Sequence, residues 1–319
     1  MENTKEPQTS MIHTEHFLPA GDSHLIPLKS WLPAKPQSAL LIAHGMGEHA
    51  GRYAALAEWL NQRDVAVFAI EHRGHGPHCE RENLGHYADT DGWNRVVSDL
   101  GIAVSHVREC FPALPLTLFG HSMGSFISQA FAQRHGDQID NLVLSATNRI
   151  NHRQLRASQA LVNGIRALKG KRYVSPLIGR LTFGAFNRAF RPNRTTHDWL
   201  SRDAAQVDRY LADPYCGFGC TTQLWSDFLG GMLAIDPGQW RRDLPVHILS
   251  GTADAVGEMG RGVKQHIRAI RSAGVTGGSE RLFEGGRHEL VNEINAEEVW
   301  LHLLDCHQAG ALQTERMSA

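Results

Sequence analysis

The segment that most constrains this chain is LTLFGHSMGS, residues 116–125, where an apolar run ends in a serine between two glycines. The apolar run predicts a buried strand, and the residues after Ser122 predict a helix. A serine at such a junction stands above the sheet only if the chain turns very tightly. Gly120 and Gly124 remove the side chains that would obstruct this turn. The pattern G-x-S-x-G therefore predicts a nucleophile elbow, although an ordinary glycine-rich turn remains the alternative at this point.

The rest of the chain alternates short apolar runs with segments of helical periodicity, which predicts a mostly parallel sheet with helices on both faces. Two antiparallel edge strands are expected between Ile12 and Trp31. Further strands are expected at 39–45, 65–70, 116–120, 141–146, 246–251 and 281–285. Helices are expected at 52–61, 93–110, 122–135 and about 258–272, and from Ala296 onward. The predicted fold class is α/β.

Residues 147–236 interrupt this alternation. They have helical character, are punctuated by prolines and contain no convincing strand. An insertion of this length between two sheet strands predicts a helical cap over the carboxyl ends of the strands. We therefore expect a disordered N-terminus at 1–10, a core formed by 11–146 and 237–310, and a cap segment at 147–236.

The composition favours a globular protein and excludes several classes of function. The 32 basic and 33 acidic residues give a net charge of −1, so nucleic acid is not an expected partner. The first residues lack the basic and apolar regions of a signal peptide, and no apolar stretch approaches the ~20 residues of a membrane span. Five scattered cysteines do not suggest a disulfide framework. The sequence predicts a cytoplasmic location.

A serine nucleophile needs a base and an acid, expected in the chain order Ser, Asp or Glu, His. Asp254 follows the strand at 246–251, and His288 follows the last strand after a glycine pair. Glu258 competes with Asp254, but its position predicts a residue in the first turn of a helix. We therefore expect His288 to take the Ser122 proton and Asp254 to orient the imidazole.

The oxyanion of an acyl-transfer intermediate needs two hydrogen-bond donors. One is expected to be the backbone N–H of Met123, directly after the nucleophile. The other is expected from the turn HGMGEHAGRY at 44–53, where the N–H of Met46 is best placed. Both assignments concern the backbone, so neither methionine side chain has a predicted chemical role.

Five motifs together resemble the monoacylglycerol lipase and lysophospholipase branch of the α/β hydrolases, a branch also grouped with serine aminopeptidase-like (S33) hydrolases. The motifs are HGMGEHAGRY, EHRGHG, GHSMGS, GTADAVG and GGRHELVNE, and the resemblance extends over residues 12–308. It implies an α/β-hydrolase fold, the same three catalytic residues and the same oxyanion donors. Glu71 stands where the branch usually has aspartate, a difference we expect to be structural.

Two other features of the sequence suggest metal or redox chemistry. EHRGHGPHC (71–79) has histidine and cysteine spacings that a zinc ion could use, but no second ligand pair is evident. Cys216 and Cys220 could form a redox pair, although buried or cap-lining thiols are the simpler interpretation. No glycine-rich phosphate-binding motif follows a strand, so we expect neither a cofactor nor a metal.

The cap segment has an uneven charge distribution. No acidic residue lies between Asp140 and Asp198, whereas this stretch contains eleven basic residues interleaved with apolar ones. These are Arg149, Arg153, Arg156, Arg166, Lys169, Lys171, Arg172, Arg180, Arg188, Arg191 and Arg194. The pattern predicts either a solvated basic face or a surface in peripheral contact with anionic membranes.

The predicted function is hydrolysis of carboxylic esters of single-chain lipids, such as monoacylglycerols or lysophospholipids. General carboxylesterase activity and S33-type aminopeptidase activity are alternatives, although an aminopeptidase needs acidic groups for the free α-amine and the first half of the cap has none. Dehalogenase and epoxide hydrolase chemistry require an aspartate nucleophile. A non-catalytic binding protein would have lost part of the predicted triad.

Overall fold

The computed structural model describes residues 12–318, and the side-chain surroundings of residues 13–309. The expected disordered segment 1–10 lies outside the described residues. The chain forms one eight-stranded sheet with the order β1-β2-β4-β3-β5-β6-β7-β8. The strands are β1 Ile12–Pro19, β2 Leu25–Leu32, β3 Ser38–Ala43, β4 Val65–Ile70, β5 Leu116–His121, β6 Asn141–Ser145, β7 Val246–Gly251 and β8 Glu280–Phe283.

The sheet is antiparallel at one side and parallel elsewhere. β1 pairs with β2, and β2 with β4, in antiparallel register, whereas all pairs from β4 across to β8 are parallel. The mostly parallel sheet predicted from the sequence is therefore confirmed. The expectation of two edge strands is wrong for β2, because β4 covers its second edge. Parallel pairing brings the carboxyl ends of β3 to β8 to one edge of the sheet.

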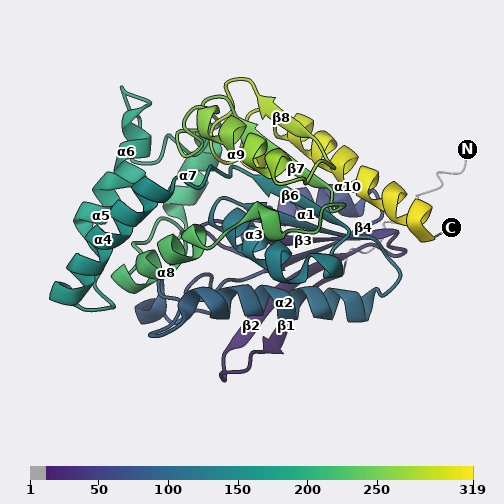
Figure 1. The fold of residues 1–319 in the computed structure, drawn as a ribbon, viewed down its shortest axis with the longest axis horizontal. Coiled ribbons are helices and arrows are strands. Elements are labelled where there is room, and N and C mark those ends of the chain that lie inside the picture. Colours follow the sequence, from purple (N-terminus) through teal and green to yellow (C-terminus); the bar gives the residue numbers. More distant parts are fainter. Residues whose placement is uncertain (1–11, 319) are drawn as a thin grey trace, which may run out of the picture.

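Helices cover both faces of the sheet because successive strand side chains point to opposite sides. Leu40 and Ile42 of β3 belong to the apolar layer under α1 and α10, whereas Leu41 and Ala43 belong to the layer under α2, α3 and α9. These helices are α1 Ala54–Asn61, α2 Gly92–Cys110, α3 Met123–His135, α9 Arg261–Ser272 and α10 Ala296–Ser318. Figure 1 shows α2 and α3 in front of the sheet.

Five helices lie between β6 and β7 in the sequence. They are α4 His152–Lys169, α5 Pro176–Leu181, α6 Phe183–Arg188, α7 Ala204–Ala212 and α8 Thr222–Leu233. Figure 1 shows α4, α5 and α6 at the end of the molecule away from both termini. Within 147–236, the only β interaction described is an isolated bridge between Val174 and Thr221. In the described part of the chain, no helix has both the length and the apolar character needed to span a bilayer.

The start of α9 differs from the expectation of a helix from about Glu258. Glu258, Met259 and Gly260 have φ values of 55°, 54° and 79°, so the right-handed helix begins only at Arg261. Glu258 is therefore not a first-turn residue, and that part of the prediction was wrong. Its carboxylate instead accepts a hydrogen bond from Arg149 Nε at 2.8 Å.

The expected helix at 52–61 also starts later than predicted. A 3-10 turn, η1 (Ala50–Tyr53), comes first, and α1 starts at Ala54. The imidazole of His49 caps this turn by accepting a hydrogen bond from the N–H of Gly51. The turn therefore fixes the chain between β3 and α1, close to the carboxyl edge of the sheet.

Candidate active site

Ser122 occupies the turn between β5 and α3. Its φ and ψ are 50° and −116°, a conformation that non-glycine residues rarely adopt and that costs of order 1–3 kcal/mol. The N–H of Ser122 donates to the carbonyl of Ser145 at 2.9 Å. The turn is thus held by the neighbouring strand, and the serine hydroxyl is half-buried at the edge of the sheet.

The two glycines of the motif are required by close approaches of the backbone. A Cβ on Gly120 would lie 2.5 Å from Ser128 Oγ and 2.7 Å from the Gly124 carbonyl oxygen. A Cβ on Gly124 would lie 2.1 Å from the carbonyl oxygen of Ala43, at the end of β3. Both glycines are therefore required by close packing around the turn, as the predicted nucleophile elbow needs.

The structure brings the other two predicted residues to Ser122. His288 Nε2 lies 2.8 Å from Ser122 Oγ, and His288 Nδ1 lies 3.0 Å from Asp254 Oδ1. Asp254 follows β7 and His288 follows β8, so the three side chains come from three loops at the same edge of the sheet. Both His288 and Asp254 are buried. The Asp254 Oδ1 atom also accepts a hydrogen bond from the N–H of Val256 at 2.9 Å.

The environment of His288 favours protonation of its ring. Burial alone lowers the pKa of an imidazole, but the charge and hydrogen bond of Asp254 act in the opposite direction and prevail. The pKa of His288 is therefore raised above its usual 6.5. This arrangement suits a base that becomes an imidazolium during the reaction.

The two predicted oxyanion donors are positioned near the elbow. Met123 is the first residue of α3, so its N–H has no acceptor within the helix. Met46 lies in the loop between β3 and η1, and none of the hydrogen bonds among described residues uses its N–H. A Cβ on Gly45, next to Met46, would lie 3.4 Å from Ser122 Cβ. The loop therefore runs directly past the nucleophile.

His44 holds the start of this loop in place. Its Nδ1–H donates to the carbonyl of Gly45 at 2.7 Å, and its Nε2 accepts from the N–H of His72 at 3.1 Å. Complete burial lowers the pKa of His44 well below 6.5, so the ring is neutral. The contact of 3.5 Å between His44 and Glu71 is consequently not an ion pair.

Glu71, where the sequence departs from the resembling branch, supports the same region. Its Oε1 accepts a hydrogen bond from the N–H of Ala50 at 2.6 Å, at the first residue of η1. A Cβ on Gly76 would lie 2.2 Å from the Glu71 carboxyl group, so the side chain fits only beside a glycine. Burial raises the pKa of Glu71 to about 7.

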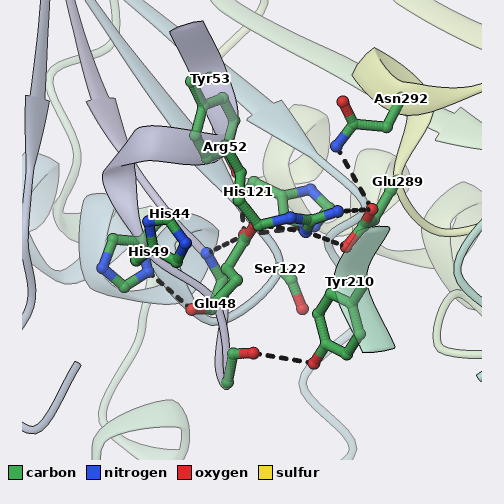
Figure 2. A network of polar contacts seen from close by, with 12 residues as sticks. His44, Glu48, His49, Arg52, Tyr53, His121, Ser122, Tyr210, Glu289 and Asn292 are labelled. Atoms are coloured by element: carbon green, nitrogen blue, oxygen red, sulfur yellow. Dashed lines mark hydrogen bonds and ion pairs between the residues drawn. The ribbon is translucent and has the colours of Figure 1, made fainter. Parts of the chain in front are cut away.

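Sequence reasoning did not single out a buried ionic network beside Ser122. Arg52 lies between the carboxylates of Glu48 and Glu289, as Figure 2 shows. Glu289 directly follows His288, whereas Glu48 belongs to the loop that contains Met46. The only signal in the sequence was that these charged residues lie within two of the quoted motifs.

A second set of residues that sequence reasoning did not identify lies in the cap segment. The Trp199 and His288 rings have centroids 4.9 Å apart, and the carbonyl of Leu200 accepts the N–H of Glu289 at 2.7 Å. Arg287 also donates to the carbonyl of Asp198. Residues 198–200 are therefore buried against the loop of the predicted base.

One cluster has the residue types of a metal site. The ligand atoms of His49, Asp213 and Cys216 lie within 4.8 Å of one another. However, His49 Nδ1 accepts the N–H of Gly51, so the neutral ring carries its proton on Nε2, which donates to Asp213 at 2.8 Å. A metal on Nε2 would require the opposite tautomer. Burial also raises the pKa of the Cys216 thiol, so the cluster fits a hydrogen-bonded link better than a metal site.

Three of the four candidate zinc ligands in EHRGHGPHC have other polar contacts, whereas neither ring nitrogen of His72 has a hydrogen-bond partner among the described residues. His75 Nδ1 lies 2.9 Å from the carbonyl of Arg73, and His78 Nε2 lies 2.9 Å from Glu15. Cys79 Sγ lies 3.4 Å from the carbonyl oxygen of Glu80. All five cysteines, which fall within the described residues, are free thiols, including Cys216 and Cys220.

The mostly parallel sheet, the strained serine turn after β5 and the loops after β7 and β8 define an α/β hydrolase. The family model described as "Serine aminopeptidase, S33" (Hydrolase_4) matches residues 34–295, and the chain belongs to this family. It is 27% identical to mouse monoglyceride lipase over 288 residues, which cover 88% of this chain and 84% of the mouse protein. The chain is thus a monoglyceride lipase-like α/β hydrolase.

Solved structures show the same fold. A thermostable carboxyl esterase from Bacillus coagulans, in complex with glycerol, has a TM-score of 0.83 at 22% identity and covers 93% of this chain and 100% of its own. A soluble variant of monoglyceride lipase from Saccharomyces cerevisiae has a TM-score of 0.75 at 17% identity and covers 97% of this chain and 98% of its own. At these identities the likeness concerns the fold.

Proposed function

We propose that this chain hydrolyses carboxylic esters that carry a single acyl chain, such as monoacylglycerols or lysophospholipids. The observation that carries the proposal is the continuous hydrogen-bonded series Asp254, His288, Ser122. It lies near the N–H groups of Met46 and Met123, which make no hydrogen bond among the described residues. A serine with a base, an orienting acid and two oxyanion donors has the parts that acyl transfer requires.

In the proposed mechanism, Ser122 Oγ attacks the ester carbonyl carbon while His288 Nε2 takes the hydroxyl proton. The N–H groups of Met46 and Met123 stabilise the tetrahedral oxyanion. His288 then protonates the departing alcohol, which leaves Ser122 acylated. A water molecule, deprotonated by His288, then attacks the acyl carbon. The bond from this carbon to Ser122 Oγ breaks, His288 returns the proton to Oγ, and the carboxylic acid is released. Asp254 stabilises the imidazolium in both steps.

A lipid substrate is supported by the apolar surroundings of the base. Trp199 stacks on Phe183, with centroids 5.9 Å apart, and also contacts Phe186. These rings come from the cap segment 147–236, which we propose forms the wall that contacts the acyl chain. The mouse relative, named a monoglyceride lipase, supports the same class of substrate.

Aminopeptidase activity is the competing function because the family description names it. Binding a free α-amine requires an unpaired carboxylate near the nucleophile. Glu48 and Glu289 are the carboxylates in the Arg52 network, and both accept hydrogen bonds from that guanidinium. The network therefore argues against an amine site and favours an ester substrate.

The proposal is tested with an active-site fluorophosphonate and a panel of p-nitrophenyl and glyceryl esters of graded chain length. We expect labelling of Ser122, and glyceryl esters of medium or long chains as the better substrates. Faster cleavage of proline-naphthylamide than of monoacylglycerol would favour the aminopeptidase. A preference for short p-nitrophenyl esters without glyceryl ester turnover would favour a general carboxylesterase. Absence of labelling would favour a non-catalytic binding protein.

We also propose that the cap segment contacts anionic membranes peripherally. Among the residues whose side chains are described, six of the twelve exposed large hydrophobic side chains lie between residues 161 and 181: Leu161, Leu168, Tyr173, Val174, Leu177 and Leu181. Lys169 and Arg180 lie within the same stretch of the sequence and are also exposed. A basic and apolar surface of this kind binds anionic lipid headgroups and inserts apolar side chains between them.

Co-sedimentation with vesicles tests this contact. The double variant K169E/R180E should lose binding to anionic vesicles at low salt, whereas R261E/R268E, with equal charge change on exposed positions of α9, should bind as the unmodified protein does. Equal binding to neutral and anionic vesicles would refute the electrostatic part. The cytoplasmic location stays a prediction from the sequence.

A further inference from the structure

Arg52 connects the two loops that lie on either side of Ser122. Its Nη1 donates to Glu48 Oε2 at 2.9 Å and to Glu289 Oε1 at 2.5 Å, and its Nη2 donates to Glu289 Oε2 at 2.7 Å. The pairing with Glu289 is bidentate, so it fixes the orientation as well as the distance between the groups. The three side chains are largely buried, with exposed fractions of 9% or less.

Each carboxylate also holds the loop to which it belongs. Glu48 Oε1 accepts the N–H of Gly45 at 2.6 Å and the hydroxyl of Tyr53 at 2.9 Å. Gly45 directly precedes Met46, so Glu48 controls the course of the loop at the predicted oxyanion donor. Glu289 directly follows His288. A contact that holds Glu289 therefore also holds the backbone from which the His288 imidazole extends.

The cap segment also contacts Arg52 and the loop that contains Met46. The Tyr210 ring of α7 lies 4.9 Å from the Arg52 guanidinium carbon, and its hydroxyl donates to the carbonyl of Gly47 at 2.8 Å. The N–H of Gly217 donates to the same carbonyl at 2.9 Å. Figure 2 shows Tyr210 and Arg52 within one network of polar contacts. The guanidinium thus lies where the oxyanion loop, the base loop and the cap meet.

We propose that Arg52 is a positioning residue that holds the Met46 N–H and the His288 imidazole in fixed geometry around Ser122. The proposal rests on the proposed function of this site. Arg52 does not contact the reacting atoms. It acts through Glu48 on the oxyanion loop and through Glu289 on the base loop.

The positive charge of Arg52 and its bidentate geometry should affect the site in different ways, and variants can separate the two effects. His288 is surrounded by Asp254, Glu289, Glu48 and His121, and the three carboxylates all favour its protonated form. Burial lowers the pKa of His121 to about 4, so this neighbour is neutral. Arg52 is thus the cation paired with Glu48 and Glu289, and its positive charge opposes their effect on the pKa of His288.

Three variants address these contributions. R52K keeps the positive charge but loses the planar bidentate fork. R52M removes both, and E289Q removes one carboxylate while retaining its shape. R73K is the matched control, because Arg73 makes an equally buried bidentate pair with Asp99 on α2, at 2.5 and 2.9 Å. Each protein is compared by its kcat, KM and pH–rate profile on a p-nitrophenyl ester, its rate of fluorophosphonate labelling and its thermal midpoint.

R52K should lower kcat roughly 10- to 100-fold, because the bidentate geometry is lost. KM and the acidic limb of the pH–rate profile should be unchanged, because the positive charge is kept. R52M should lower kcat further and move the acidic limb to higher pH, because two unbalanced carboxylates then favour the imidazolium. E289Q should move the acidic limb to lower pH. R73K should lower only the thermal midpoint.

A kcat and pH profile for R52K and E289Q that match the unmodified protein would overturn the proposal, even if R52M fails to fold. So would the same change in kcat and pH profile in R73K, since this would reflect general destabilisation. If the unmodified protein neither labels nor hydrolyses esters, the proposed function itself fails. Labelling of R52K at the unmodified rate refutes only the role of Arg52.

Discussion

His288 Nε2 lies 2.8 Å from Ser122 Oγ although the two residues are 166 positions apart in the chain. The parallel sheet explains this proximity. β5 and β8 are parallel and end at the same edge of the sheet, with β6 and β7 between them. Local sequence supplies the serine turn, but the sheet order determines which histidine reaches it.

Replacing Ser122 separates chemistry from backbone strain. Ser122→Ala should lower kcat by roughly 10⁴-fold or more, because the nucleophile is lost, and the circular dichroism spectrum should be unchanged. Ser122→Gly should be equally inactive but more stable than Ser122→Ala by about 1 kcal/mol, because glycine tolerates the positive φ of 50°. Urea unfolding measures the difference. An alanine variant as stable as the glycine variant would show that this turn is not strained.

The pH dependence should reflect the carboxylate beside His288. Because Asp254 raises the pKa of His288, the neutral base is lost below that raised value, and the acidic limb of kcat/KM should lie above pH 6.5. Asp254→Asn should lower kcat roughly 10³- to 10⁴-fold and move the limb to lower pH. The pH–rate profile on a p-nitrophenyl ester checks both effects. A limb that does not move in Asp254→Asn would contradict the assignment of His288 as the titrating base.

The contact between Gly124 and β3 predicts a large effect of one methyl group. In Gly124→Ala the new Cβ would lie 2.1 Å from the Ala43 carbonyl oxygen, so the elbow must shift and stability should fall by several kcal/mol. Gly164→Ala in α4 is the matched control. Nothing lies within 4 Å of its Cβ, and helix propensity should stabilise that variant by up to ~1 kcal/mol. The midpoint of thermal unfolding should therefore fall in Gly124→Ala and rise in Gly164→Ala.

Glu71 should make the protein less stable at higher pH. Its pKa of about 7 means that the folded state retains a proton that the unfolded state releases from about pH 4.5 upward. The associated stability is present below pH 4.5 and is lost as the pH rises through 7, a difference of roughly 3 kcal/mol. Glu71→Gln should therefore gain stability at pH 8 relative to pH 5, as measured by urea unfolding at both values.

Glu15→Gln is the control of opposite sign for this pH experiment. Burial acts to raise the pKa of Glu15, but Lys29 and His78 lower it overall, so its contribution to stability is present at pH 8 and is lost in acid. This variant should lose stability at pH 8. A parallel response of both variants would indicate a general charge effect and not the burial of Glu71.

The sheet was predictable because its apolar runs are short and separated by helical periodicity. The structure also brings together Ser122, Asp254 and His288, which were identified from the G-x-S-x-G motif, the order of the three residues in the chain and the strand before each of them. The pairing of Arg52 with Glu289 was not predictable, since these residues are 237 positions apart and no local pattern relates them. The late start of α9 was missed for another reason: Met259 has a positive φ that side-chain type does not indicate.

The cap segment leaves and re-enters the sheet between two neighbouring strands. β6 and β7 are paired from Leu142 and Val246 to Ser145 and Leu249, and residues 146–245 lie entirely between them in the sequence. Another segment joined at these two junctions would leave the hydrogen bonds between β6 and β7 in place. Such a segment would still have to replace Leu224, Trp225 and Phe228 of α8, which belong to the same apolar core as α2 and α3. It would also have to reproduce the contacts that residues 198–200, Tyr210 and Gly217 make with the two loops of the site. The insertion is thus separable at its junctions with the sheet, but its packing ties it to the core and to the site.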